Sequence, residues 1–200
     1  MIILGIETSC DETSASILKD GYVLSNVVCT HLEHTKYGGV VPEIASKNHE
    51  KLILNIVTKA LEDASIIKSN IDAIAVTYGP GLIGSLLVGL NFAKGMSVGL
   101  KIPIIGVNHL EGHLLSNFIN KKKIIYPYLC LLVSGGHTQI VFVNKNNYKI
   151  IANTVDDAAG EAFDKGARIL GLKYPGGPEI EKLSINADFQ KYNFTIPKVK

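Results

Sequence analysis

The chain carries the same three-strand pattern twice, about 125 residues apart, and this repeat limits the possible folds more than any other feature. Residues 2–28 show an apolar run, a small polar turn, a second apolar stretch, a turn at 19–21 and a third strand. Residues 128–152 repeat the design, with Ser-Gly-Gly-His between the first two strands. Such spacing is typical of antiparallel meanders. We therefore predict a duplicated fold.

Alternating helical and strand patterns follow each meander, so the fold class is α/β. The apolar helix after the glycine loop 79–85 should be buried, because its apolar residues lie all round it. After the first meander we predict helices over 42–64, from the glycine loop to about Leu100 and over 109–120, with strands over 71–76 and 104–107. After the second we predict a helix over 158–170, a turn over 174–178 and a short helix from Glu179.

We place the first half of the duplicated fold at residues 1–127 and the start of the second half at 128–200. The second half lacks the long helices of the first, so we expect it to be incomplete. A chain that is 46% hydrophobic and 19% charged can bury a core. No uninterrupted apolar run reaches the roughly 18 residues of a membrane span, and the N-terminus lacks the features of a secretion signal.

The cysteines and the charge balance are consistent with a cytoplasmic protein. Three widely spaced cysteines form no C-x-x-C pair, which favours reduced, buried thiols. The formal charge of +2, with a single arginine, neither requires nor excludes a nucleic-acid partner. The run Lys121–Lys123 suits phosphate contacts, although such runs are more often only solvated.

His109 and His113 are the strongest candidates for a metal site. Histidines four apart lie on one helix face and can bind one ion. A pair of satisfied histidines is the alternative. A zincin protease is disfavoured, because Glu111 does not directly follow the first histidine.

The turn Ser134–Thr138 can direct several backbone N–H groups at one anion, although a plain hairpin turn explains it equally well. For the loop Gly79–Ser85, close helix packing is a better explanation than phosphate binding, because the loop lacks the lysine of a P-loop.

Three carboxylates, Glu7, Asp11 and Glu12, occupy the turn of the first meander, where they could take part in catalysis or simply stabilise the turn. We expect Asp156 and Asp157 to cap the following helix, and Asp164 could meet a ribose hydroxyl. The remaining histidines, His31, His34 and His49, are expected at the surface.

Six motifs together resemble the bacterial-type catalytic subunit of tRNA threonylcarbamoyladenosine synthase, a family formerly labelled O-sialoglycoprotein endopeptidase. The resemblance covers nearly the whole chain in the right order. The motifs are GIETSCDET at 5–13, YGGVVPE at 37–43, GPGL at 79–82, HLEGH at 109–113, SGGHT at 134–138 and DDAAGEAFDK at 156–165.

The resemblance implies the duplicated fold of actin, sugar kinases and heat-shock chaperones. It also implies transfer of threonylcarbamoyl from threonylcarbamoyl-AMP to the exocyclic amine of the adenosine that adjoins the anticodon, in tRNAs reading codons that begin with A. The implied partners are tRNA, a non-catalytic paralogue, a small ATPase and an enzyme that makes the adenylate.

Residue by residue, the resemblance makes His109 and His113 ligands of one iron or zinc ion. Asp11, Glu12 and His137 correspond to the polar residues that flank the reacting carbonyl. The substrate-binding positions are Leu132, Val133, Ser134, Gly135 and Gly136, with Asp164 and Gly177 near the nucleotide.

Family members continue well beyond this length and supply an Asp as third metal ligand and an Asn at the nucleotide. We therefore expect weak metal retention and little turnover from these 200 residues alone. The alternative function is a catalytically incomplete fragment or a non-catalytic module that binds a partner. A kinase or chaperone of the same fold is less favoured, because the histidine pair has no purpose there.

Overall fold

The computed structural model of the protein describes residues 1–119, 125–145, 147–188 and 190–193. The lysine run at 121–123 lies outside these residues. The chain divides into two compact units, Met1–Ile124 and Ile125–Lys200, and each is described by itself.

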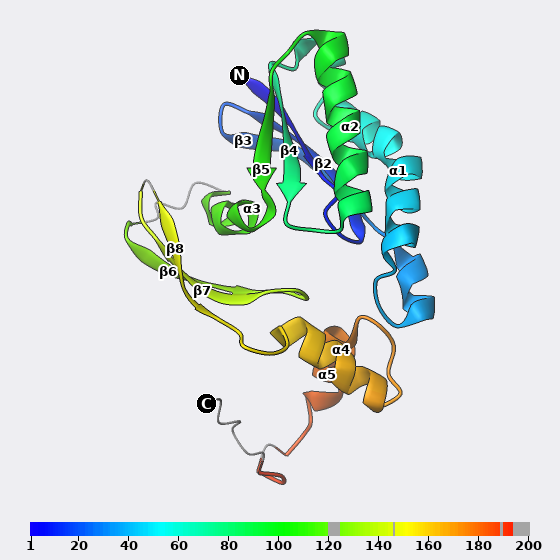
Figure 1. The fold of residues 1–200 in the computed structure, drawn as a ribbon, viewed down its shortest axis with the longest axis vertical. Coiled ribbons are helices and arrows are strands. Elements are labelled where there is room, and N and C mark those ends of the chain that lie inside the picture. The colour runs from blue at the N-terminus through cyan, green and yellow to red at the C-terminus, as the bar shows by residue number, and fades with distance from the viewer. Residues whose placement is uncertain (120–124, 146, 189, 194–200) are drawn as a thin grey trace. The chain divides into compact units, whose positions relative to one another are not determined.

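The first unit is built on a five-stranded sheet of order β3-β2-β1-β4-β5 (Figure 1). The predicted meander forms its antiparallel part, and β4 and β5 continue the sheet in parallel with β1. Parallel neighbours place the carboxyl ends of β1, β4 and β5 at one edge of the sheet. The strands are β1 (Ile2–Glu7), β2 (Glu12–Lys19), β3 (Tyr22–Thr30), β4 (Ala73–Gly79) and β5 (Ile104–Asn108).

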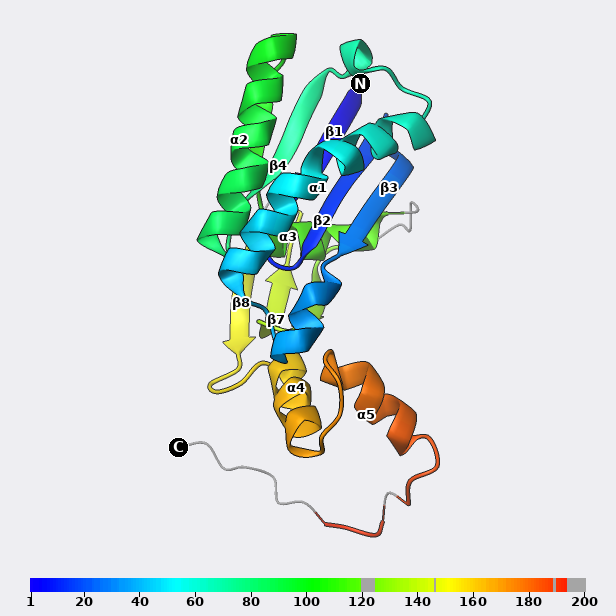
Figure 2. The ribbon, with the colours of Figure 1, turned by 90° about the vertical axis from the view of Figure 1, so that its right-hand side faces the viewer.

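Two long helices, α1 (Pro42–Asp63) and α2 (Ile83–Leu100), pack on one face of this sheet (Figure 2). Proline suits the first turn of α1, because its missing N–H would have no helical partner there. Alternate residues of the central strands, among them Leu4, Ile74 and Val76, face the helices and are fully or almost fully buried. The core of this unit therefore lies between the sheet and the two helices.

The outer face of α2 corrects the expectation that this helix is buried all round. Only Ser85, Gly89 and Ala93 are buried, whereas Val98 keeps 78% of its surface exposed. A helix on an open sheet buries only the stripe that meets the strands, so its composition alone does not determine its burial. The sequence analysis rejected a membrane span because no uninterrupted apolar run is long enough, yet by length and composition alone Ile83–Leu100 could cross a membrane. In this unit, however, it packs on β4.

Close packing explains the glycine loop and the start of α2, as the sequence analysis favoured. A side-chain carbon at Gly81 would lie 2.6 Å from the carbonyl oxygen of Ser9, and one at Gly89 would lie 2.3 Å from Thr8 Oγ1. The Thr8 hydroxyl is buried and donates to the carbonyl of Ser85, 2.9 Å away. The β1–β2 turn therefore rests directly on the backbone of α2.

The remaining elements of the first unit are short. Helix α3 (His109–Leu115) follows β5 without a loop and passes into η3 (Ser116–Phe118), so the predicted helix over 109–120 is shorter than expected. Two further 3-10 helices are η1 (Leu32–Tyr37) and η2 (Lys68–Asn70).

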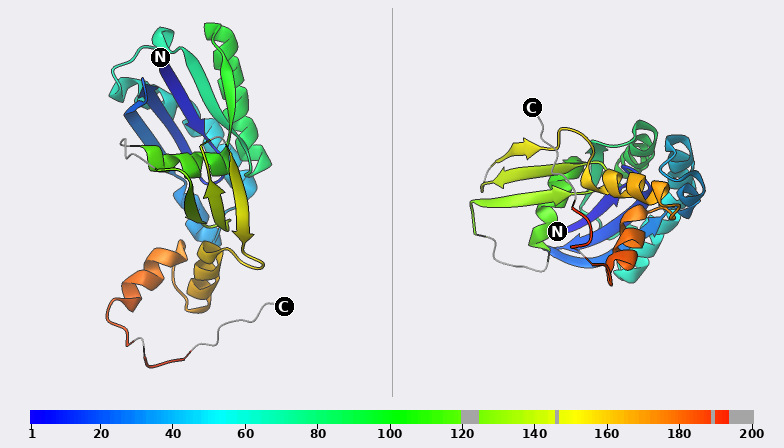
Figure 3. Two further views of the ribbon diagram at one scale, coloured as in Figure 1. Left: turned by 90° about the vertical axis from the view of Figure 1, so that its left-hand side faces the viewer. Right: turned by 90° about the horizontal axis from the view of Figure 1, so that it is seen from below.

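The second unit begins with the second predicted meander, β6 (Tyr128–Val133), β7 (Thr138–Val143) and β8 (Tyr148–Asn153), in the order β6-β7-β8. Helices α4 (Ala159–Ile169) and α5 (Gly176–Ser184) pack against each other (Figure 3). The prediction that Asp156 and Asp157 cap α4 is wrong. Thr138 Oγ1 accepts from the Ala159 N–H instead, and Asp157 forms an ion pair with Lys165.

Two expectations about burial are also wrong. His31, His34 and His49 are 3%, 0% and 0% exposed, although they were expected at the surface. They pair with one another and with Thr13, which single residues in a sequence do not reveal. Conversely, Cys10 is exposed, and Cys29 and Cys130 are only half-buried.

Replacing Gly89 with alanine should destabilise the first unit, because the new carbon meets the buried Thr8 hydroxyl at 2.3 Å. Overpacking of this kind costs about 2 kcal/mol in the free energy of unfolding, measured by urea denaturation. Gly95→Ala on the same helix is the matched control. It meets open space, and we expect a gain of roughly 0.5–1 kcal/mol from helix propensity. Equal effects of the two substitutions would contradict the close approach.

The buried histidines should make the fold less stable as the pH falls below neutrality. Burial, followed by the neighbouring His49 and His34 rings, lowers the pKa of His31 from 6.5 to about 4, although Asp11 and Glu33 act in the opposite direction. His31 therefore takes up a proton near pH 6.5 in the unfolded chain, but only near pH 4 in the folded chain. The stabilisation is complete above 6.5, and about 2 kcal/mol is lost between pH 8 and pH 5.

Unfolding free energies measured across this range should decline less steeply in His31→Gln. Glu7 does not affect this comparison. Its pKa is lowered from 4.5, so its contribution to the free energy of unfolding is lost only below pH 4.5. Identical slopes in the two proteins would show that His31 does not titrate as expected.

Candidate functional site

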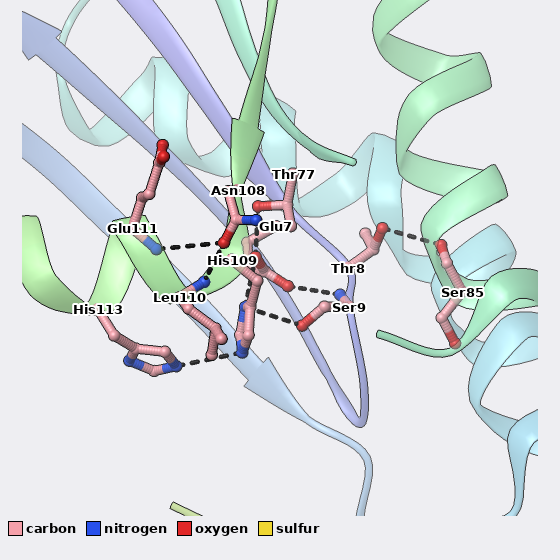
Figure 4. A network of polar contacts seen from close by, with 10 residues as sticks. All are labelled: Glu7, Thr8, Ser9, Thr77, Ser85, Asn108, His109, Leu110, Glu111 and His113. Carbon is pink, nitrogen blue, oxygen red and sulfur yellow. Dashed lines mark hydrogen bonds and ion pairs between the residues drawn. The ribbon is translucent and has the colours of Figure 1, made fainter. Parts of the chain in front are cut away.

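The carboxyl edge of the parallel strands gathers polar side chains from three elements (Figure 4). Glu7 ends β1, Thr77 lies near the end of β4, and His109 directly follows β5. Glu7 Oε2 accepts from the Thr77 hydroxyl and lies 3.3 Å from His109 Nδ1. Residues separated by 70 and 102 positions meet because parallel strands end at the same edge.

Helix α3 holds both members of the predicted metal pair in position. Its first backbone N–H groups, those of Leu110 and Glu111, donate to the side chain of Asn108 at 2.9 and 3.3 Å. Asparagine is a favoured N-cap because its oxygen satisfies such N–H groups. His109 and His113 then lie one turn apart, with their Nε2 atoms 3.1 Å from each other.

Glu7 orients the first imidazole of the pair. Burial by itself raises the pKa of the Glu7 carboxyl, but hydrogen bonds from His109, Ser9 and Thr77 outweigh it and bring the pKa to about 2. An ionised carboxylate only accepts hydrogen bonds, so the proton of neutral His109 lies on Nδ1. The lone pair of Nε2 is then directed toward His113. The Ser9 hydroxyl lies 3.2 Å from the same Nδ1.

The geometry of the pair suits a shared metal ion. Two nitrogen ligands at about 2.0–2.1 Å from one tetrahedral ion lie about 3.3 Å apart, close to the 3.1 Å between these Nε2 atoms. A carboxylate behind a ligating histidine is the usual orienting arrangement, and Glu7 takes that place. In the described residues, however, no three His, Cys, Asp or Glu side chains are placed to hold one ion.

A cavity of about 450 Å³ lies beside the histidine pair, on the face of the sheet away from α1 and α2. Gly5, Ser14 and Ser16 line it from the strands, and His109 and His113 line it from α3. The small side chains of the strand residues leave space over the sheet. The pair therefore faces a space that a small ligand can enter.

The predicted catalytic carboxylates Asp11 and Glu12 lie at the far end of the β1–β2 turn. Asp11 is half-buried, and its carbonyl accepts from the backbone N–H of His31 at 2.9 Å. Glu12 is exposed and accepts from the Thr30 hydroxyl at 2.9 Å. Of the three carboxylates in this segment, Glu7 is the one that contacts the histidine pair.

In the second unit, Leu132 and Val133 end β6, and residues 134–137 form the tight turn that leads into β7. The Ser134 N–H donates to the carbonyl of His137, and the His137 N–H donates to Ser134 Oγ. Leu132 is buried, whereas Val133 is exposed. A carbon added at Gly135 or Gly136 would meet no described heavy atom within 4 Å. The face of the turn is therefore open to a ligand.

Helix α4 connects this turn to the other predicted nucleotide residues. The Gly160 N–H donates to the carbonyl of Ser134 at 3.2 Å, and a side-chain carbon at Gly160 would lie 2.8 Å from that oxygen. Asp164 Oδ1 accepts from the Gly176 N–H at 2.7 Å, next to Gly177. Asp164 thus anchors the start of α5, a role that its position in the sequence did not suggest.

The sequence analysis did not identify how Glu7, Ser9 and Thr77 support His109. It placed Glu7 among the carboxylates of the turn but did not assign it to the histidine pair. The available signal was positional: Glu7 is the last residue of a strand that pairs in parallel with β4, as β4 does with β5.

Sequence comparisons identify relatives along almost the whole chain. Residues 22–200 match the family described as tRNA N6-adenosine threonylcarbamoyltransferase. A protein of that name from Thermosipho africanus is 57% identical over 98% of this chain and 60% of its own length. Another, from Caldicellulosiruptor saccharolyticus, is 53% identical over 100% of this chain and 60% of its own length. The chain thus spans about 60% of the length of these curated relatives.

Solved structures are similar in fold at low sequence identity. The ethanolamine utilization protein EutJ from Carboxydothermus hydrogenoformans superposes with a TM-score of 0.53 at 13% identity, covering 91% of this chain and 61% of its own. An uncharacterized Pseudomonas aeruginosa protein with similarity to peptidase YEAZ gives 0.51 at 18% identity, covering 76% and 63%. The α/β fold class predicted from the alternating helix and strand patterns is confirmed.

Proposed function

This chain belongs to the tRNA N6-adenosine threonylcarbamoyltransferase family, and we propose that it takes part in threonylcarbamoyl transfer to tRNA. The donor is threonylcarbamoyl-AMP, and the acceptor is the exocyclic amine of the adenosine adjoining the anticodon, in tRNAs reading codons that begin with A. The observation that carries the proposal is the histidine pair: the two Nε2 atoms lie 3.1 Å apart, and Glu7 holds the opposite nitrogen of the His109 ring.

His109 and His113 hold one iron or zinc ion in this proposal. Imidazole nitrogen suits both metals. When bound, the ion supplies Lewis-acid assistance to an activated acyl group. With His109 and His113 as its protein ligands, a bound ion would need further ligands, which the resemblance assigns in part to an Asp of the longer family members. Glu7 keeps the His109 lone pair directed at the ion.

The turn at Ser134, Gly135 and Gly136, with the flanking Leu132 and Val133, is proposed to bind the adenylate. Open backbone at two consecutive glycines lets the N–H groups approach a phosphate closely. Asp164 and Gly177 are proposed near the nucleotide, and the bond from Asp164 to Gly176 would hold that segment in place.

The transfer itself needs an activated donor and a group that accepts the proton of the attacking amine. The amine nitrogen attacks the carbamoyl carbon, the bond from that carbon to the phosphate oxygen breaks, and AMP leaves with the bonding electrons. Asp11, Glu12 or His137 takes the proton from the attacking amine. N–H groups of the glycine turn stabilise the charge that develops on the leaving phosphate. We further propose a cytoplasmic complex with a non-catalytic paralogue and a small ATPase.

Metal binding tests the role assigned to Glu7. Titration calorimetry with Zn²⁺ should show about tenfold weaker binding in Glu7→Gln, because the amide neither fixes the proton on Nδ1 nor supplies charge. His109→Ala should abolish the binding. Glu111→Gln is the matched control, since its side chain points away from the imidazoles in Figure 4. Equal affinities in the two glutamine variants would exclude an orienting role for Glu7.

Transfer itself is tested with labelled threonylcarbamoyl-AMP, unmodified tRNA and the proposed partner proteins. From these 200 residues we expect slow labelling of tRNA, reduced by roughly a hundredfold or more in the His109→Ala, His113→Ala double variant, since a bound metal supplies several kcal/mol to such reactions. The Thermosipho africanus relative serves as a positive control. Label with that relative but none with this chain would favour the alternative, an incomplete fragment or partner-binding module.

A further inference from the structure

The three buried histidines surround one hydroxyl group behind the β1–β2 turn. Thr13 Oγ1 lies 2.9 Å from His31 Nε2 and 2.8 Å from His49 Nδ1. The His31 ring packs edge-on against His49, with centroids 4.6 Å apart, and lies 6.0 Å from His34. Thr13, like His34 and His49, is fully buried. None of these groups contacts the histidine pair or takes part in the chemical steps of the proposed transfer.

The inner end of the cluster determines two of the three tautomers. His49 Nε2 lies 3.0 Å from the carbonyl oxygen of Cys10, which can only accept, so this nitrogen carries the proton. In a neutral ring Nδ1 must then accept, and the Thr13 hydroxyl donates its single proton to it. The Thr13 oxygen therefore accepts from His31 Nε2–H, which leaves His31 Nδ1 as an acceptor.

At the outer end of the cluster, a contact with Val41 determines the tautomer of His34. The backbone N–H of Val41 can only donate, and it lies 3.3 Å from His34 Nδ1. In a neutral His34 ring the proton is then on Nε2. Among the described residues, His31 Nδ1 and His34 Nε2 are two of the few buried side-chain atoms that lack a hydrogen-bond partner. One is an acceptor and the other a donor, on neighbouring rings.

We propose that one buried water joins these two nitrogens and completes a one-directional chain of hydrogen bonds from Val41 to Cys10. The order is Val41 N–H, His34, water, His31, Thr13, His49 and the Cys10 carbonyl. Every group donates toward Cys10, so the bonds polarise one another. A water between two such sites accepts from His34 and donates to His31, as buried waters commonly do.

The chain positions the turn that carries Asp11 and Glu12. Two consecutive carbonyls of that turn are bound by the cluster, Cys10 by the His49 ring and Asp11 by the backbone N–H of His31. The charged groups that act electrostatically on the rings are Asp11 and Glu33 at His31, and Glu7 and Asp11 at His49. Thr13, His31, His34 and His49 are thus positioning residues, a role that rests on the proposed function.

Nitrogen NMR of the imidazoles tests the chain without any assumption about activity. At pH 7.5 the unaltered chain should show His31, His34 and His49 each with a proton on Nε2 and none on Nδ1, with slowly exchanging ring protons. A cross-peak should join the His34 ring proton to a bound water. Protonation on Nδ1 in any of the three would overturn the direction of the chain, and absence of the cross-peak would overturn the water.

Substitutions at Thr13 distinguish this bridge from simple packing. Thr13→Val keeps the shape of the side chain but removes the hydroxyl, so His31 Nε2 and His49 Nδ1 both lose their hydrogen-bond partner. We therefore expect the His31 ring proton to exchange about tenfold faster or more. Thr13→Ser should restore slow exchange. The control Thr35→Val lies in η1, where the Thr35 hydroxyl bonds only locally to Leu32, and should leave the signals unchanged. Unchanged exchange in Thr13→Val would overturn the bridge.

The two Thr13 variants also test the positioning role, in the transfer assay. Thr13→Val should lower kcat while KM for tRNA stays constant, and Thr13→Ser should recover most of the loss. Equal turnover in Thr13→Val and the unaltered chain would overturn the role, although the tautomers would still stand. Tautomers as expected in a chain without transfer activity would instead refute the proposed function.

Discussion

The parallel pairing of β1 with β4, and of β4 with β5, is the constraint on which the rest of the first unit depends. It brings the ends of three segments, far apart in sequence, to one edge of a sheet. The same pairing requires a helix between successive strands, and α2 supplies it between β4 and β5. Glu7 then links all three strand ends by accepting from Thr77 and from the His109 ring.

Local pattern was sufficient to predict most elements and the shared helix face of His109 and His113, while their binding of a metal stays a prediction. Both meanders and α1 follow from strand and helix periodicity, and His109 and His113 follow from a four-residue spacing that any helix would turn to one side. The predicted roles of the residues at 132–137, Asp164 and Gly177 rest on the family resemblance and stay predictions. The structure describes their surroundings without testing what they bind.

What the sequence could not reveal depends on contacts between distant segments. His31, His34 and His49 read as polar surface residues, because a buried imidazole becomes acceptable only once other groups satisfy its nitrogens. The burial of α2 was overestimated because composition says how apolar a helix is, but not how much surface lies against it. Asp156 and Asp157 were assigned as caps from their position before α4, where the distant Thr138 hydroxyl satisfies the N–H of Ala159 instead.

Because α3 follows β5 without a linker, the direction in which the histidine pair points depends on the length of β5. Asn108 ends the strand and His109 begins the helix, with no linker to absorb a change in length. One residue added within 104–108 would turn the imidazoles about 100° around the helix axis or reverse which face of the sheet each strand residue occupies. An insertion that a surface loop would tolerate would therefore turn the pair away from Glu7, and the length of this strand constrains the direction of the two imidazoles as strictly as their identity does.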